Sequence, residues 1–182
     1  LADWRQLWRE AVTDAHELLA LLELDHLAGE LPAADAGFRL RVPRGFVARM
    51  RRGDRHDPLL LQVLPQLAEL ETAPGFTRDA VGDLDARTAP GVLHKYQGRA
   101  LLIASGTCAI NCRYCFRRHF PYAEELAAAQ QWREALAYLR QEDSISELIL
   151  SGGDPLALST GKLAELSVGL VDTTHVRRIR IH

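Results

Sequence analysis

The sequence has 182 residues, of which 47% are hydrophobic and 25% are charged, as is ordinary for a globular protein with a proper core. Its formal net charge of −2 gives no electrostatic argument for binding to nucleic acid or to a membrane surface. No apolar run reaches membrane-spanning length, and residues 1–4 do not resemble a signal peptide. Because the sequence lacks an initiator Met and stops at His182 inside an expected strand, we expect a fragment of a longer protein.

The first half of the sequence predicts mainly helical structure. Apolar residues spaced by three and four predict one amphipathic helix over about 3–27, with its tryptophans in the core. Apolar residues alternate with arginines over 38–42, which predicts a short strand. A short helix is expected over 46–52, and Asp-Pro opens another over 57–64. Repeated Ala-Pro-Gly and scattered acids over 71–91 predict a long surface connection.

The second half predicts alternating strands and helices. Short runs that are apolar on both faces, over 99–105 and 147–151, predict covered parallel strands. Apolar spacing predicts helices over about 130–141 and 163–171, and a third strand begins over 178–182. This β-α-β-α-β order predicts an α/β fold with right-handed crossovers, the start of a parallel barrel or sheet.

All three cysteines of the sequence lie within eight residues, at Cys108, Cys112 and Cys115, spaced C-x3-C-x2-C. An odd, clustered set cannot be a self-contained disulfide framework, so it favours metal or cluster ligation in a reducing compartment. Three thiolates can hold three irons of a cubane cluster and leave the fourth iron open to a small molecule. Two alternatives stay open: a structural Cys3His zinc site completed by His119, and an incidental cluster of thiols.

A second motif, Gly152-Gly153-Asp154, directly follows the strand expected over 147–151, as the cysteine loop follows 99–105. Because parallel strands end at the same edge of a sheet, we expect both motifs beside one pocket. Glycines let the backbone approach a ligand closely and take positive φ, and edge carbonyls beside a carboxylate suit an ammonium group. The alternative is an ordinary turn in which Asp154 caps a helix.

These motifs resemble the radical S-adenosylmethionine (SAM) superfamily, in which an aromatic residue, here Tyr114, precedes the third cysteine. The Gly-Gly-Asp motif is similar to the superfamily's Gly-Gly-Glu motif, and Asp for Glu is common in its lysine 2,3-aminomutase branch. The strings over 112–122 and 151–156 resemble the members of that branch that serve β-lysylation of elongation factor P. Supporting matches upstream are Gly53-Asp54, Asp57-Pro58-Leu59 and Leu93-His94-Lys95-Tyr96.

The resemblance implies a fold and an activity. The fold is a partial, truncated (β/α) barrel of the radical SAM type over 99–182, preceded by a mainly helical extension over 1–98. The activity is that of an isomerase in the cytoplasm, which converts (S)-α-lysine to (R)-β-lysine for modification of elongation factor P. A metabolic aminomutase acting on a free amino acid is the alternative, and the variants at Phe116 and 119–122 argue against it.

The resemblance also implies cofactors and site residues. The cofactors are a [4Fe–4S] cluster, SAM and pyridoxal phosphate, and the partners are an electron donor and proteins of the elongation factor P pathway. Reductive cleavage of SAM would yield the radical that starts migration of the amino group. Arg117 matches the arginine that binds the substrate carboxylate, a role suited to its bidentate fork, although a surface charge is the alternative. The implied ligands are Cys108, Cys112 and Cys115 for the cluster, and Tyr114, Gly152, Gly153 and Asp154 for SAM.

The lysine that binds pyridoxal phosphate is expected beyond His182. The chain offers two lysines, Lys95 and Lys162, and neither lies in a recognisable pyridoxal site. We therefore expect this chain alone not to isomerise lysine.

Overall fold

The computed structural model describes residues 3–33, 39–122, 124–127 and 132–182. Phe38 of the expected strand and residues 130–131 of the expected helix lie outside these ranges. The chain forms two compact units, which are described separately. Unit 1 is Leu1–Ala80 with Ala109–His119, and unit 2 is Val81–Cys108 with Phe120–His182. The proposed domain boundary between residues 98 and 99 stays a prediction.

Unit 1 begins with two short helices, so the single helix expected over 3–27 is wrong. Helix α1 is Trp4–Arg9 and α2 is Ala15–Leu21, and aspartates at 3 and 14 cap them. Between the helices Val12 is extended and exchanges two 2.9 Å hydrogen bonds with Val42. This pairing and the second cap interrupt the helix despite the continuous apolar period. Trp4 in α1 is exposed, so the tryptophan stripe is not wholly in the core.

The rest of unit 1 consists of short helical turns around a compact apolar core. A 3-10 helix, η1, is Asp25–Glu30; α3 is Arg44–Val47, shorter than the 46–52 expected. The carboxylate of Asp57 accepts the N–H groups of Leu59 and Leu60, but the helix it was expected to open is one 3-10 turn, η2, Leu60–Gln62. A further turn, η3, is Leu67–Leu70. The core is formed by Val12, Leu18, Leu19, Leu22, Leu24, Leu27, Leu40, Val42, Val47, Met50, Leu60, Val63 and Leu64.

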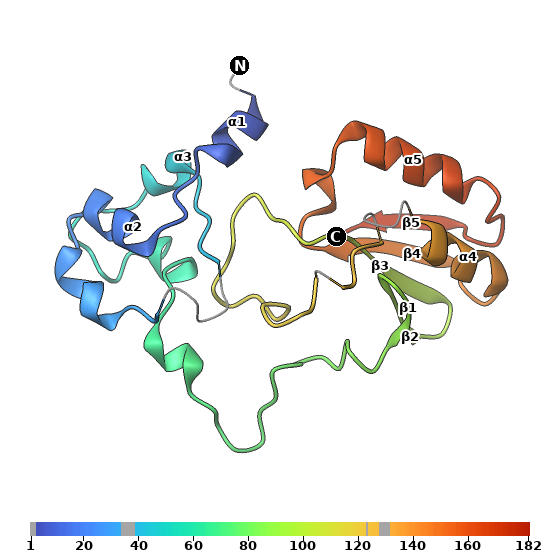
Figure 1. Ribbon diagram of the computed structural model, residues 1–182, viewed down its shortest axis with the longest axis horizontal. Coiled ribbons are helices and arrows are strands. Elements are labelled where there is room, and N and C mark those ends of the chain that lie inside the picture. Colours follow the sequence, from blue (N-terminus) through green and yellow to red (C-terminus); the bar gives the residue numbers. More distant parts are fainter. Residues whose placement is uncertain (1–2, 34–38, 123, 128–131) are drawn as a thin grey trace. The chain divides into compact units, whose positions relative to one another are not determined.

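Unit 2 contains a mixed five-stranded sheet in the order β1-β2-β3-β4-β5 (Figure 1). The strands are β1 Arg87–Ala89, β2 Val92–Tyr96, β3 Arg99–Ser105, β4 Glu147–Gly152 and β5 Arg178–Ile181. Strands β3, β4 and β5 are parallel, as the sequence predicts, and this confirms the α/β class. The first two strands add an antiparallel hairpin that the sequence did not predict; β1 lies in the stretch expected to be a surface connection. Closure into a barrel stays a prediction.

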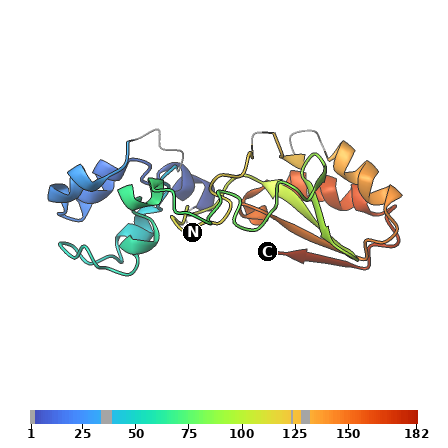
Figure 2. The ribbon, with the colours of Figure 1, turned by 90° about the horizontal axis from the view of Figure 1, so that it is seen from below.

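Two helices pack on the sheet of unit 2, α4 Arg133–Gln141 and α5 Thr160–Leu170 (Figure 2). Leu136 of α4 and Leu166 of α5 share one buried cluster with Leu102 and Leu148. The even-numbered side chains of β3 and β4 alternate onto this face of the sheet. No helix in the described ranges is long and apolar enough to cross a bilayer.

Candidate functional site

The carboxyl ends of β3 and β4 lie side by side in unit 2. The two strands are parallel and pair in one register from Arg99 opposite Glu147 to Ile103 opposite Ser151; the register then shifts, so that Ser105 lies opposite Gly152. The segment before Cys108 and the Gly-Gly-Asp turn therefore leave the sheet at the same edge. This confirms the strand arrangement on which the predicted site depends, and it is the edge where parallel α/β folds bind ligands.

Backbone hydrogen bonds join these two segments. The N–H of Gly153 donates to the carbonyl oxygen of Ser105 at 2.5 Å, and the N–H of Asp154 donates to that of Thr107 at 2.8 Å. The hydroxyl of Ser105 accepts the N–H of Thr107 at 3.1 Å and closes a small turn there. The Gly-Gly-Asp turn thus fixes the backbone that enters the cysteine loop.

The two glycines are needed for different reasons. Gly152 has φ +112°, in the region that favours glycine, and a Cβ there would collide with the carbonyl oxygen of Ser105. Gly153 does not have a positive φ; the constraint is space, because a Cβ would lie 2.5 Å from the carbonyl oxygen of Thr107. The expectation of positive φ therefore holds at the first glycine and not at the second.

The carboxylate of Asp154 accepts the N–H of Leu156 at 2.9 Å and caps the 3-10 turn η5, Pro155–Ala157. The capping role left open by the sequence is therefore present. The additional role of Asp154 in binding SAM stays a prediction.

The part of the cysteine loop in unit 1 is bonded to two other segments of that unit. Asn111 donates its backbone N–H to the carbonyl oxygen of Arg41 at 3.0 Å, and its side-chain amide to that of Arg39 at 2.7 Å. The N–H of Arg113 donates to the carbonyl oxygen of Gln62 at 2.8 Å. Backbone bonds on either side of Cys112 therefore fix its position on unit 1.

Cys112 and Cys115 lie close together within one turn. The N–H of Cys115 donates to the carbonyl oxygen of Cys112 at 3.1 Å. Burial raises the pKa of the Cys112 thiol above its ordinary value, and the neighbouring Cys115 adds to this shift. A raised thiol pKa means that metal binding there must displace a proton.

The three cysteines are of the residue type that binds an iron–sulfur cluster. All three cysteines lie in the described part of the chain; none forms a disulfide, and each is half-buried. Cysteine side chains, once deprotonated, are the ligands that iron–sulfur clusters use. Within the described ranges, however, no three His, Cys, Asp or Glu side chains are already placed to hold a metal ion.

The other candidate residues on the loop have distinct environments. Tyr114 is 67% exposed, so its ring is available to a ligand. Arg117 is 7% exposed, with its guanidinium carbon 4.6 Å from the ring centroid of Phe116. Such burial is uncommon for a surface charge, and the role of Arg117 toward a substrate carboxylate stays a prediction. His119, the fourth ligand of the zinc alternative, is exposed.

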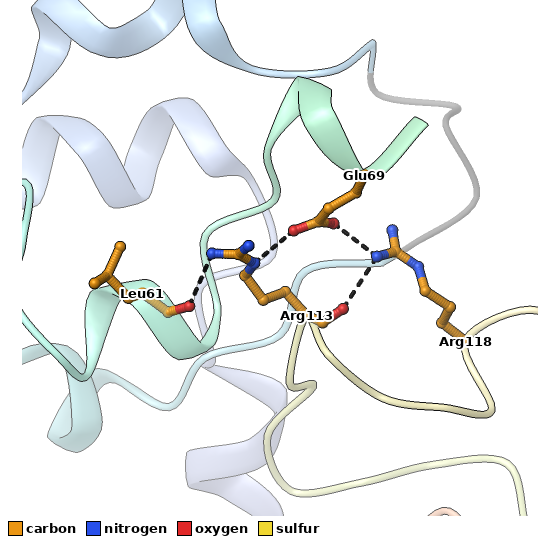
Figure 3. A network of polar contacts seen from close by, with 4 residues as sticks. All are labelled: Leu61, Glu69, Arg113 and Arg118. Carbon is orange, nitrogen blue, oxygen red and sulfur yellow. Dashed lines mark hydrogen bonds and ion pairs between the residues drawn. The ribbon is translucent and has the colours of Figure 1, made fainter. Parts of the chain in front are cut away.

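An ion-pair network in unit 1 was not expected from the sequence (Figure 3). The two carboxylate oxygens of Glu69 bind Nε of Arg113 at 2.5 Å and Nη1 of Arg118 at 2.7 Å. Nη1 of Arg118 also donates to the carbonyl oxygen of Arg113, and Nη1 of Arg113 to that of Leu61. Nothing in the sequence distinguishes Glu69 from other acids, because its partners lie 44 and 49 residues away.

Residues 97–177, which contain both motifs, match the family model described as a 4Fe-4S single cluster domain. The chain is 46% identical over 99% of its length to a protein of Escherichia coli K12 named L-lysine 2,3-aminomutase, of which it covers 53%. Proteins of the same name from Haemophilus influenzae and Buchnera aphidicola are 41% and 38% identical over 99% of the chain, which covers 54% of each. The chain thus spans about half the length of the curated relatives it matches. Its similarity over nearly every residue shows that the chain belongs to the lysine 2,3-aminomutase family.

Proposed function

We propose that this protein is a radical SAM lysine 2,3-aminomutase that converts (S)-α-lysine to (R)-β-lysine for modification of elongation factor P. The observation that carries the proposal is the 46% identity, over 99% of the chain, to a protein named L-lysine 2,3-aminomutase. The elongation factor P branch is supported by the strings over 112–122 and 151–156, which resemble that branch. A metabolic aminomutase remains the alternative.

Cys108, Cys112 and Cys115 would hold the [4Fe–4S] cluster as its three thiolate ligands. When bound, the cluster and SAM supply the radical initiator, and pyridoxal phosphate activates the amino group that migrates. The role of the chain is to present three deprotonated thiols. Backbone bonds from Asn111 and Arg113 support that role, because they fix the chain on both sides of Cys112.

Gly152, Gly153 and Asp154 would bind the methionyl amino group of SAM. The proposal is supported by their place at the carboxyl edge of β4, directly beside the segment that leads to Cys108. Carbonyl oxygens at a strand edge accept hydrogen bonds from an ammonium group, and a nearby carboxylate adds electrostatic attraction. Tyr114 would pack against the adenine, a role that its exposed ring allows.

Arg117 would bind the carboxylate of the substrate. A guanidinium presents two parallel N–H groups that match a carboxylate, and a buried position strengthens the attraction because screening by water is reduced. The burial of Arg117 supports this role. The lysine that binds pyridoxal phosphate would lie outside this chain, and an electron donor would reduce the cluster.

Two broader proposals accompany the reaction. Residues 99–182 would be the first β/α units of a partial barrel, with residues 1–98 as an N-terminal extension. The protein would act in the cytoplasm, since clustered thiols require a reducing compartment to remain available for iron.

The test is anaerobic reconstitution of the purified chain with iron and sulfide, followed by iron, sulfide and zinc analysis. We expect four irons and four sulfides per chain and an electron paramagnetic resonance signal, after reduction, that SAM changes. A colourless protein with one tightly bound zinc would overturn the proposal in favour of the Cys3His site.

A further inference from the structure

We propose that Glu69 is a positioning residue, which holds the segment from Arg113 to Arg118 in the conformation that the cluster needs. The inference rests on the proposed cluster function and adds a residue outside both motifs. Glu69 lies on η3, and its side chain is only 12% exposed. Its carboxylate is therefore largely shielded from water and binds its two arginine partners, Arg113 and Arg118.

The two arginines stand at the ends of the segment that carries Cys115. Arg113 directly follows Cys112, and Arg118 comes three residues after Cys115. Since Glu69 binds one arginine with each carboxylate oxygen, it closes the segment into a loop (Figure 3). The 3.0 Å bond from Nη1 of Arg118 to the carbonyl oxygen of Arg113 closes the same loop a second time.

The backbone from Cys112 to Arg118 makes two successive turns. The N–H of Cys115 donates to the carbonyl oxygen of Cys112, and the N–H of Arg118 donates to that of Cys115, both at 3.1 Å. These bonds set the spacing of the backbone at Cys112 and Cys115. A carboxylate that ties Arg113, in the first turn, to Arg118, at the end of the second, limits the opening of both turns. Charge-assisted hydrogen bonds of this kind are stronger than bonds between neutral groups.

Glu69 also balances charge beside the thiols. Without its carboxylate, two cations of low exposure would remain near the thiols, Arg113 next to Cys112 and Arg118 three residues after Cys115. They would repel each other and lose their shared acceptor. The expected consequence is a looser Cys112–Cys115 turn, while the distant core of unit 1 remains folded.

The experiment compares Glu69→Gln and Glu69→Asp with a matched control, Glu125→Gln. Glu125 lies in unit 2, its side chain is 11% exposed, and it binds Arg87 at 3.0 Å, so the control neutralises a carboxylate of similar burial that also binds an arginine. The first readout is the rate at which each cysteine of the metal-free protein reacts with iodoacetamide, mapped by peptide mass. The second is the iron and sulfide content after anaerobic reconstitution, with the paramagnetic resonance spectrum of the reduced protein.

We expect Glu69→Gln to react several-fold faster at Cys112 and Cys115 with little change at Cys108, and to hold less cluster with an altered spectrum. Glu69→Asp keeps the charge and should recover most of both properties, and Glu125→Gln should match the wild type. Equal reactivity and loading in Glu69→Gln and wild type would overturn this inference alone. So would faster reaction of all three cysteines together, which would indicate general unfolding. A wild type that binds no iron–sulfur cluster would overturn the proposed function as well.

Discussion

A Cβ atom on Gly153 would lie 2.5 Å from the carbonyl oxygen of Thr107, closer than such atoms approach in real proteins. The same oxygen accepts the N–H of Asp154. The fit between the Gly-Gly-Asp turn and the segment before Cys108 is therefore tight enough that one added methyl group must displace one of them.

Gly153→Ala should separate binding of SAM from binding of the cluster. Because the turn has no room for the methyl group, we expect a loss of about 1–3 kcal/mol in the free energy of unfolding, as is typical of overpacking. We also expect a weaker change in the paramagnetic resonance signal on addition of SAM, with iron and sulfide content maintained. Urea unfolding and a SAM titration of the reduced protein measure the two effects.

The matched control for that variant is Gly161→Ala in α5, where the nearest atom to an added Cβ is 3.9 Å away. It should leave the free energy of unfolding unchanged or raise it by up to about 1 kcal/mol, because alanine is more favourable than glycine in a helix. If Gly153→Ala responds to SAM as the wild type does, the turn is not part of the SAM site.

The three parallel strands of unit 2, β3, β4 and β5, were predictable because their signal is local. The run over 99–105 is apolar on both faces, and β3 has those bounds. The prediction of a single helix over 3–27 was wrong because Val12 pairs with Val42. This contact joins residues that are far apart in the sequence, so the spacing of apolar residues does not reveal it. Strand β1 was missed because it is three residues long and exposed, and it exists through its pairing with β2.

The candidate site divides in the same way. Cysteine spacing and the Gly-Gly-Asp string are local patterns tied to a specific chemistry, so the sequence is sufficient to propose them. Glu69 belongs to no such pattern, because its proposed role depends on two arginines that lie far from it in the sequence and contact it only in the folded chain. The burial of Arg117 also required the structure, since arginine in a loop is usually solvated.

Two substitutions on the cysteine loop distinguish iron–sulfur ligation from zinc ligation. Iron–sulfur proteins are brown. Cys112→Ala removes a ligand under either hypothesis, so we expect this variant to lose the brown colour of the reconstituted cluster. His119→Ala should retain the cluster, because three thiolates suffice for it, whereas a Cys3His zinc site would lose a ligand. The measurement is visible absorption with iron and zinc content. Loss of metal from His119→Ala would contradict the cluster hypothesis.

Asp57 is expected to make unit 1 sensitive to acid. Burial opposes its ionisation, but N–H groups of Arg51, Leu60 and Leu59 and the charge of Arg51 outweigh burial and lower its pKa below the ordinary value. A carboxyl with a lowered folded pKa contributes stability above its unfolded pKa, about 3.9, and loses it as pH falls through the folded pKa. We therefore expect stability to fall below about pH 4.

The corresponding variant is Asp57→Asn, which keeps one acceptor oxygen but turns an amide toward the N–H of Arg51. It should lose about 1–3 kcal/mol in urea unfolding at neutral pH, the usual effect of an unmade buried hydrogen bond. The difference from the wild type should shrink below about pH 4, where the wild-type carboxyl also becomes protonated. Asp14→Asn is the control, because Asn caps an exposed helix such as α2 as well as Asp does. A pH-independent difference at Asp57 would contradict this account.

The last prediction concerns the two lysines and pyridoxal phosphate. Lys95 lies on β2, near the amino end of β3 and away from the edge at Ser105, and its Nζ donates to the carbonyl oxygen of Val81. Lys162 is on α5 and pairs with Glu165 at 2.9 Å. A lysine captures a carbonyl cofactor only when its amine is available for attack, and both amines have other partners.

After incubation with pyridoxal phosphate and reduction with borohydride, peptide mapping should find no stoichiometric label on either lysine, and the 182-residue chain should form no β-lysine. Variants with Lys95→Arg or Lys162→Arg should give the same background labelling as the wild type. Stoichiometric labelling that one of these variants removes would place the pyridoxal site within this chain.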